Sequence, residues 1–184
     1  DALASSAEFL RQKGWQQGLP WGFEVILPSQ FDFRTGAHPF SDWRASGIAR
    51  ADGRAMPDQG EARLFLPAGA AGPAFLVTAN FDVIKRYNAS DAYALGVAHL
   101  GDLLMGGEAF RAAWPEHEKP LTQAQRIEIQ KTLTRLGYSV GKPDGRMGSR
   151  TREAIRDFQR RRGIIPDGYP NERMLEALRN SASL

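Results

Sequence analysis

The sequence predicts a mainly α-helical chain with a small β region, divided into two units. Apolar residues at helical spacing occur near the start and throughout the last third, whereas the middle holds short β-prone runs between Pro, Gly and Asp residues. Residues 1–118 carry 10 basic and 14 acidic side chains, and residues 119–184 carry 14 basic and 7 acidic ones. Because glycines, prolines and charges fill 106–120, we expect a connector there and a boundary at residue 118.

The composition excludes several classes of protein. Hydrophobic residues make up 42% of the chain and charged residues 24%, as in an ordinary globular protein. No apolar run approaches the ~18 residues that a membrane span needs. With no cysteine, disulfides and thiolate zinc sites are excluded, and the isolated His38, His99 and His117 lack a second ligand at metal spacing. We therefore expect no metal site and no cofactor.

Two helices and three short strands are predicted in residues 1–118. Leu3, Ala7 and Leu10 have helical spacing, and Gly14 follows as a stop. Short strands are expected over 23–27, 63–66 and 74–78. Ser90 can cap a further helix that ends before 106–107, and its predicted apolar stripe consists of Tyr93, Val97, Leu100 and Leu104.

Residues 119–184 predict a bundle of three short helices. The first begins at a capping box of Thr122 and Gln125 and ends at Gly137. The second ends at Gly163; its expected core face is Thr151, Ala154, Ile155 and Phe158, and its expected outer face is Arg152, Arg156, Asp157 and Arg160. The third has Met174, Leu175 and Leu178 on one side.

A short repeat lies within this bundle. Pro143-Asp144-Gly145 recurs as Pro166-Asp167-Gly168, 23 residues later. Glycine accepts a positive φ and aspartate bonds to the backbone beyond it, so each Asp-Gly predicts a turn that leads into a helix.

These residues resemble the peptidoglycan-binding type 1 module. The resemblance covers about residues 121–180 and rests on Leu136-Gly137-Tyr138, Asp144-Gly145, Gly148, Thr151 and Phe158-Gln159, in the order the family shows. It implies that residues 119–184 form a wall-binding domain.

Residues 1–118 resemble the C-terminal part of the catalytic domain of lytic murein transglycosylases of the B family. The motifs are a helix leading to Gly14-Trp15 and Pro20-Trp21-Gly22, then Asn80-Phe81, Arg86-Tyr87-Asn88 and Tyr93-Ala94. The resemblance implies the C-terminal half of a lysozyme-like fold, and an enzyme that cleaves MurNAc-GlcNAc bonds with formation of 1,6-anhydro-muramyl ends.

The resemblance also implies where the catalytic acid lies. The family uses one glutamate, which protonates the glycosidic oxygen and then acts as base while the muramyl 6-hydroxyl attacks C1. That glutamate belongs to a Glu-Ser segment upstream of all the motifs found here, so we expect a trimmed or excised chain that starts at Asp1 after it and is inactive alone. Glu24, beside Trp21 and Phe23, is the one alternative acid among residues 1–184.

No catalytic residue is therefore assigned, and Tyr87, Asn88 and Tyr93 are assigned to substrate binding by resemblance. Asn supplies an amide and a carbonyl for sugar groups, and Tyr supplies an apolar face with a hydroxyl tip. Two alternatives remain open: Tyr93 packs within its own apolar stripe, and Asn88 forms a turn before Ser90.

Three functions compete at this level. The first is a peptidoglycan-cleaving enzyme, the second is a non-catalytic peptidoglycan-binding protein, and the third is a basic bundle that binds nucleic acid. The Asp-Gly repeat favours the wall-binding module over nucleic acid. Arg160-Arg161-Arg162 is either a solvated helix end or a contact for wall anions. We expect a monomeric, exported protein of the periplasm or cell envelope, with glycan strands and peptide stems as partners, no nucleic acid and no membrane span.

Overall fold

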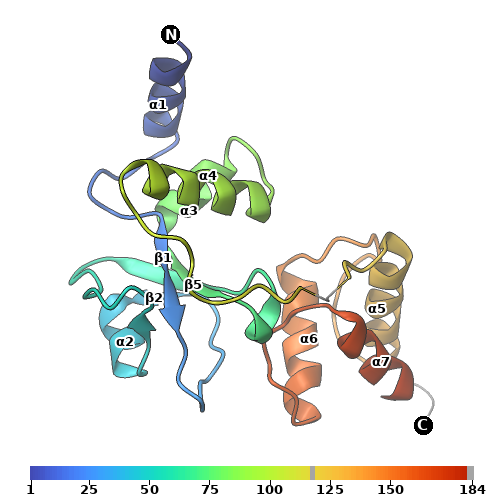
Figure 1. Cartoon of the computed structure of the whole chain (residues 1–184). Coiled ribbons are helices and arrows are strands. Elements are labelled where there is room, and N and C mark those ends of the chain that lie inside the picture. The colour runs from blue at the N-terminus through green and yellow to red at the C-terminus, as the bar shows by residue number, and fades with distance from the viewer. Residues whose placement is uncertain (117–118, 182–184) are drawn as a thin grey trace. The chain divides into compact units, whose positions relative to one another are not determined.

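The computed structural model describes residues 1–116 and 119–181 and divides them into two compact units (Figure 1). The first unit holds residues 1–67 and 73–113, and the second holds residues 68–72 and the chain from Trp114 onward. His117 and the expected boundary at residue 118 lie outside the described residues. Within the described residues, no helix combines the length and apolar character needed to cross a membrane. The predicted fold class, mainly α with a small β region, is confirmed.

The first unit is built on a five-stranded antiparallel sheet in the order β2-β4-β5-β1-β3. The three predicted runs are confirmed as β1 (Gly22–Ile26), β4 (Glu61–Phe65) and β5 (Ala74–Val77). The other two strands, β2 (Ala37–Pro39) and β3 (Ala49–Arg50), have only three and two residues. Strands this short show no periodicity, so the sequence did not predict them.

Strand β5 lies at the centre of the sheet and is buried on both faces. Ala74 and Leu76 pack on one face with Phe40 and Trp43 of helix α2 (Phe40–Ala45). On the other face, Phe75 and Val77 pack with Phe81 of helix α3 (Ala79–Lys85) and Leu95 of helix α4 (Asp91–Leu104). The uninterrupted apolar run of β5 therefore reflects a helix layer on each side of the sheet.

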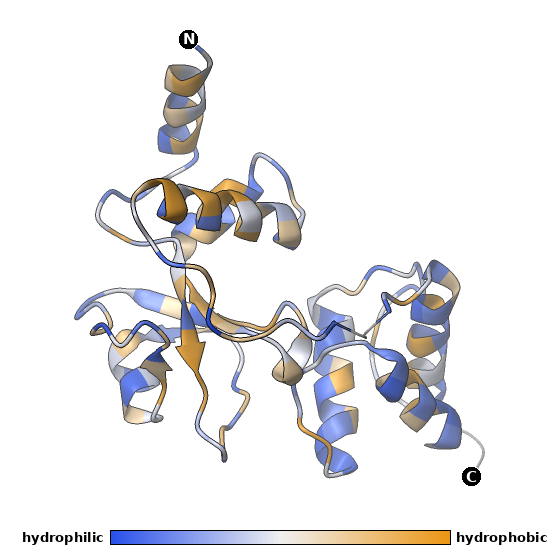
Figure 2. Cartoon of the chain, viewed as in Figure 1, coloured by the Kyte–Doolittle hydropathy of each residue, from blue (hydrophilic) through white to orange (hydrophobic). Residues whose placement is uncertain are grey.

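Two helices of the first unit were predicted, and one prediction about their packing is wrong. Helix α1 (Ala2–Gln12) is confirmed, and so is the Ser90 cap of α4, which accepts a hydrogen bond from the Tyr93 N–H. The predicted stripe of α4 faces outward, with Leu100 56% and Leu104 78% exposed, and forms an apolar surface on the helix (Figure 2). The buried face consists of Ala94, Leu95 and Ala98. The two alanines have small side chains, which let the helix approach the sheet closely.

The second unit is the predicted three-helix bundle of α5 (Gln123–Arg135), α6 (Ser149–Arg161) and α7 (Glu172–Ser181). The capping box of Thr122 and Gln125 is present. The apolar residues predicted for α6 and α7 are buried in one core with Ile129 and Leu133 of α5, and Leu136 packs against this core partly buried. The expectation for Arg156 is wrong: its side chain is only 18% exposed, because it lies against the Gly168 turn.

Candidate functional site

Of the residues assigned to substrate binding, Tyr87 and Asn88 lie between α3 and α4, and Tyr93 lies in the first turn of α4. The rings of Tyr87 and Tyr93 stack with their centroids 6.1 Å apart, and Phe9 of α1 meets the Tyr87 ring edge-on at 5.9 Å. Tyr87 is 69% exposed and Tyr93 38% exposed. The structure thus brings the two tyrosines together into one exposed aromatic surface.

Asn88 makes the turn that the sequence offered as its alternative role. Its side-chain Oδ1 accepts a hydrogen bond from the Ser90 N–H at 3.0 Å. The Asn88 side-chain amide nitrogen has no hydrogen-bond partner among the described residues and lies exposed. One end of this side chain therefore shapes the start of α4, and the other end is available to a ligand.

Asn80, part of the Asn-Phe motif, has a structural role. Its side chain is fully buried and makes three hydrogen bonds to the loop that leads to β1: it accepts from the Gln16 N–H at 2.8 Å and donates to the carbonyls of Gln16 at 2.8 Å and Leu19 at 2.6 Å. Thr78, the N-cap of α3, donates to the Pro20 carbonyl at 2.6 Å. This motif therefore joins α3 to the segment preceding β1.

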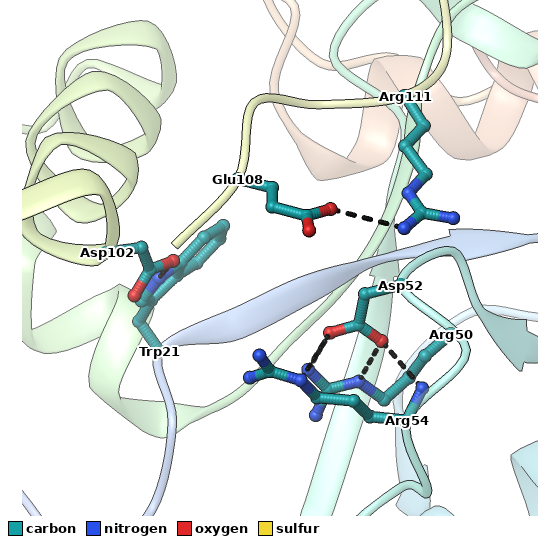
Figure 3. A network of polar contacts seen from close by, with 7 residues as sticks. All are labelled: Trp21, Arg50, Asp52, Arg54, Asp102, Glu108 and Arg111. Carbon is teal, nitrogen blue, oxygen red and sulfur yellow. Dashed lines mark hydrogen bonds and ion pairs between the residues drawn. The ribbon is translucent and has the colours of Figure 1, made fainter. Parts of the chain in front are cut away.

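A second feature of the first unit is an open cleft of about 330 Å³ beside β1. Its walls are residues 20–24, the turn from Arg50 to Arg54, and the C-terminal end of α4 with the segment up to Arg111. Figure 3 shows polar side chains from all three walls around the cleft. Gly22 belongs to the first wall, and a Cβ there would meet the Leu76 carbonyl oxygen at 2.5 Å, so only glycine lets β1 and β5 approach this closely.

Glu24 holds the third wall of the cleft in place. It pairs in register with Phe75, so its side chain projects from the face of the sheet that α3 and α4 cover. Its two carboxylate oxygens accept hydrogen bonds from the backbone N–H groups of Arg111 and Ala112, both at 2.7 Å. These two bonds fix the main chain from which the Arg111 side chain extends.

Asp52 holds the second wall. Its carboxylate accepts hydrogen bonds from Nε and Nη2 of the Arg50 guanidinium, at 2.9 and 2.5 Å, and from the Arg54 backbone N–H at 3.0 Å. The Arg50 guanidinium also lies over the Phe23 ring, 4.4 Å from its centroid. The hydrogen bond from Arg50 is the main reason that the pKa of Asp52 lies below its ordinary value.

Two further contacts lie in the wall of the cleft near α4. The Trp21 indole N–H donates to Oδ2 of Asp102 at 2.7 Å, and Trp21 itself is 6% exposed (Figure 3). The rings of His99 and Phe110 stack at 3.7 Å. No group of three His, Asp or Glu side chains that could hold a metal ion occurs in the described parts of the chain.

In the second unit, a buried glutamine holds each Asp-Gly turn. Gln130 accepts from the Gly145 N–H at 2.8 Å and donates to the Arg146 carbonyl at 3.0 Å. Gln159 accepts from the Gly168 N–H at 2.9 Å and donates to the Asp167 carboxylate at 2.8 Å. Both glycines have the positive φ that the sequence predicted.

An open groove runs along α5 beside the loop of Gly141 and Pro143. Ala124 and Ile127 contribute apolar surface, and Lys131 and Arg135 lie one helical turn apart on its wall. Neither cation forms an ion pair with a carboxylate in the described part of the chain. Arg161 of the triple-arginine segment instead lies over the Tyr138 ring, 5.1 Å from its centroid.

Sequence reasoning missed most of the cleft. It assigned neither Asp52 nor Glu108 to a functional site, and it did not predict the ion pair between Asp52 and Arg50. The alternation of Arg50, Asp52 and Arg54 was the available signal. The link from Glu24 to residues 111–112 spans more than 80 positions and left no pattern in the sequence.

Comparison with known proteins adds independent findings. The model of the transglycosylase SLT domain family matches residues 1–102, and that of a peptidoglycan binding domain matches residues 122–178. The crystal structures of SltB3 from Pseudomonas aeruginosa, which hold NAG-anhNAM-pentapeptide or NAG-NAM-pentapeptide, are similar to this chain with a TM-score of 0.91. The two sequences are 44% identical, and the match covers 97% of this chain and 50% of the SltB3 chain. The lytic transglycosylase Slt35 from Escherichia coli, in complex with bulgecin A, is 25% identical with a TM-score of 0.44, over 56% of this chain and 33% of that one. The chain thus spans about half the length of SltB3. No curated protein sequence matches significantly.

Proposed function

Since the chain belongs to the transglycosylase SLT domain family, we propose that it acts in a lytic transglycosylase that cleaves MurNAc-GlcNAc bonds of peptidoglycan and leaves 1,6-anhydro-muramyl ends. The two family resemblances found in the sequence are confirmed. The observation that carries the proposal is the 44% identity, over 97% of this chain, to SltB3, whose crystal structure holds NAG-anhNAM-pentapeptide.

The proposal divides the work between two parts of the chain. Residues 1–118 supply the C-terminal portion of the catalytic domain, and residues 119–184 supply the wall-binding domain. The first assignment is supported by the match over residues 1–102, and the second by the match over residues 122–178. Because peptidoglycan is the substrate, the proposed location is the periplasm or cell envelope.

The reaction needs one carboxyl group. A glutamic acid donates its proton to the glycosidic oxygen as the bond from C1 to that oxygen breaks. The resulting carboxylate then takes the proton of the muramyl 6-hydroxyl while this oxygen bonds to C1, so no water is consumed. Tyr87, Asn88 and Tyr93 hold the sugar near the cleaved bond, with the exposed tyrosine rings as an apolar platform and the free Asn88 amide as a donor.

We place this acid outside residues 1–184. Both oxygens of Glu24, the alternative named from the sequence, already accept backbone N–H groups. Glu8 is exposed and bonds to Arg11 and Gln12. An acid that works near neutral pH requires burial with a free oxygen facing the substrate, and neither side chain meets that requirement.

The test is the release of anhydro-muropeptides from purified sacculi, detected by mass spectrometry. The chain of residues 1–184 should release none, whereas a fusion of the unmatched part of SltB3 ahead of Asp1 should release them. Release by residues 1–184 alone would disprove the external acid. A fusion that folds and binds sacculi without cleaving them would instead support a non-catalytic peptidoglycan-binding protein.

A further inference from the structure

The cleft beside β1 holds charged groups of both signs that the cleavage step does not use. We propose that this cleft binds the zwitterionic end of a peptide stem, that is, a carbon atom that carries both a free ammonium group and a free carboxylate group. The side chain of a 2,6-diaminodicarboxylic acid, such as the diaminopimelate of many peptide stems, ends in this group. This inference rests on the proposed function. The cleft has a volume of about 330 Å³, which lies at the lower end of the range for small-molecule sites.

Two arginines provide the carboxylate-binding side. Arg54 is 77% exposed, and its only ion pair among the described residues is a loose one with Asp52 at 3.9 Å. Arg111 is 56% exposed and makes one contact with Glu108 at 3.2 Å. A guanidinium has five N–H donors, so both side chains retain donors for a ligand carboxylate.

The main chain that carries these arginines is already fixed. Asp52 accepts the Arg54 N–H at 3.0 Å, and Glu24 accepts the Arg111 N–H at 2.7 Å. Figure 3 shows Arg54 and Arg111 extending from different walls of the cleft. Because the backbone is ordered before a ligand arrives, binding loses only side-chain freedom.

Two carboxylates provide the ammonium-binding side. Glu108 is 74% exposed, and within the described part of the chain its side chain makes one polar contact, with Arg111 at 3.2 Å. Asp102 uses Oδ2 for the Trp21 indole N–H, and its Oδ1 has no hydrogen-bond partner among the described residues. An ammonium group has three donors and matches these oxygens.

The charge balance selects between ligand classes. The lining holds three arginines and four carboxylates, namely Arg50, Arg54, Arg111, Glu24, Asp52, Asp102 and Glu108. A ligand that carries only negative charge would meet a net negative lining, and one that carries only an ammonium would leave the arginine side without a counter-charge. A zwitterionic end satisfies both sides.

The test compares two stem peptides that differ at one carboxylate. L-Ala-γ-D-Glu-meso-diaminopimelate has the zwitterionic end, and L-Ala-γ-D-Glu-L-Lys has the ammonium alone. In an NMR titration of residues 1–184, the first peptide should shift the Trp21 indole N–H and the Ala112 backbone N–H, which line or border the cleft. The second peptide should bind at least tenfold more weakly at these signals. Equal affinities, or no shift at either signal, would overturn the inference.

Two substitutions locate the effect. Arg54→Gln and Glu108→Gln should each weaken binding of the diaminopimelate peptide about tenfold, and Arg11→Gln, an exposed arginine of α1 outside the cleft, should leave it unchanged. An unchanged affinity in both cleft variants would also overturn the inference. Cleavage of sacculi by the SltB3 fusion is measured separately: loss of peptide binding alone removes this inference, and loss of cleavage alone removes the proposed function.

Discussion

Gln130 and Gln159 occupy equivalent places in the two halves of the helical bundle. Each side-chain carbonyl oxygen accepts the N–H of the glycine in an Asp-Gly turn, Gly145 at 2.8 Å and Gly168 at 2.9 Å. Gln130 is 1% exposed and Gln159 is 4% exposed. The Pro-Asp-Gly repeat seen in the sequence thus has a buried counterpart on the preceding helix.

Replacing Gln130 by alanine should destabilise the bundle by about 2–3 kcal/mol, because the Gly145 N–H and the Arg146 carbonyl lose their partner. Urea unfolding followed by circular dichroism measures the change. Lys142→Ala, at an exposed loop position, is the control and should cost less than about 0.5 kcal/mol. Equal unfolding free energies for the two variants would contradict the role given to Gln130.

Asn80→Ala should destabilise the first unit by about 2–3 kcal/mol, since it leaves a buried N–H and two carbonyls without partners. Asn88→Ala is the matched control, because it removes one exposed hydrogen bond and should cost below about 1 kcal/mol. Thermal unfolding with tryptophan fluorescence distinguishes them. A melting temperature unchanged by Asn80→Ala would show that the three bonds carry no net stability.

Asp52 should make the first unit sensitive to acid. Its pKa in the folded state lies below the ordinary value of about 3.9, chiefly because of the hydrogen bond from Arg50. The stabilisation is therefore fully present above that value and is lost as the pH falls through the lower folded-state pKa. In Asp52→Asn the unfolding free energy should be lower at pH 6 and should fall less between pH 4 and pH 2. Parallel pH profiles for the two proteins would contradict this.

Two substitutions of Asn88 in the SltB3 fusion distinguish its role in the turn before Ser90 from its proposed contact with the sugar. Asn88→Asp keeps the oxygen that accepts the Ser90 N–H but removes the exposed amide donor, whereas Asn88→Ala removes both. If the amide contacts the sugar, both variants should lower kcat/KM by about tenfold or more. Full activity of the Asn88→Asp variant would contradict the sugar contact and would leave the turn as the role of Asn88. Tyr87→Phe and Tyr93→Phe then test the hydroxyl groups with the rings retained.

The cations of the α5 groove should contribute to sacculus binding. Lys131→Glu combined with Arg135→Glu reverses two charges that have no ion-pair partner in the described residues, and should reduce the fraction of the chain that sediments with sacculi. Arg11→Glu combined with Lys13→Glu, at two exposed positions at the end of α1, changes the net charge by the same amount and is the control. Equal sedimentation of all variants would remove the groove from the binding surface.

Much of the architecture followed from local patterns. The capping box of Thr122 and Gln125, the glycine stops at 137 and 163, and the Asp-Gly turns are decided by neighbouring residues, so the sequence predicted them correctly. Strands β1, β4 and β5 were recognised for the same reason. The paired motif sets in their order also indicated the family.

Which face of a helix is buried was decided only by the tertiary structure. Helix α4 has apolar residues on more than one side, and the sheet accepts the side with Ala94 and Ala98 because these small residues allow close approach, leaving Leu100 and Leu104 exposed. The cleft is likewise a product of folding, since Glu24 meets residues 111–112 and Trp21 meets Asp102 only after the strands pair. Local propensity depends on residues a few positions apart, whereas these contacts join segments about 80 or more positions apart.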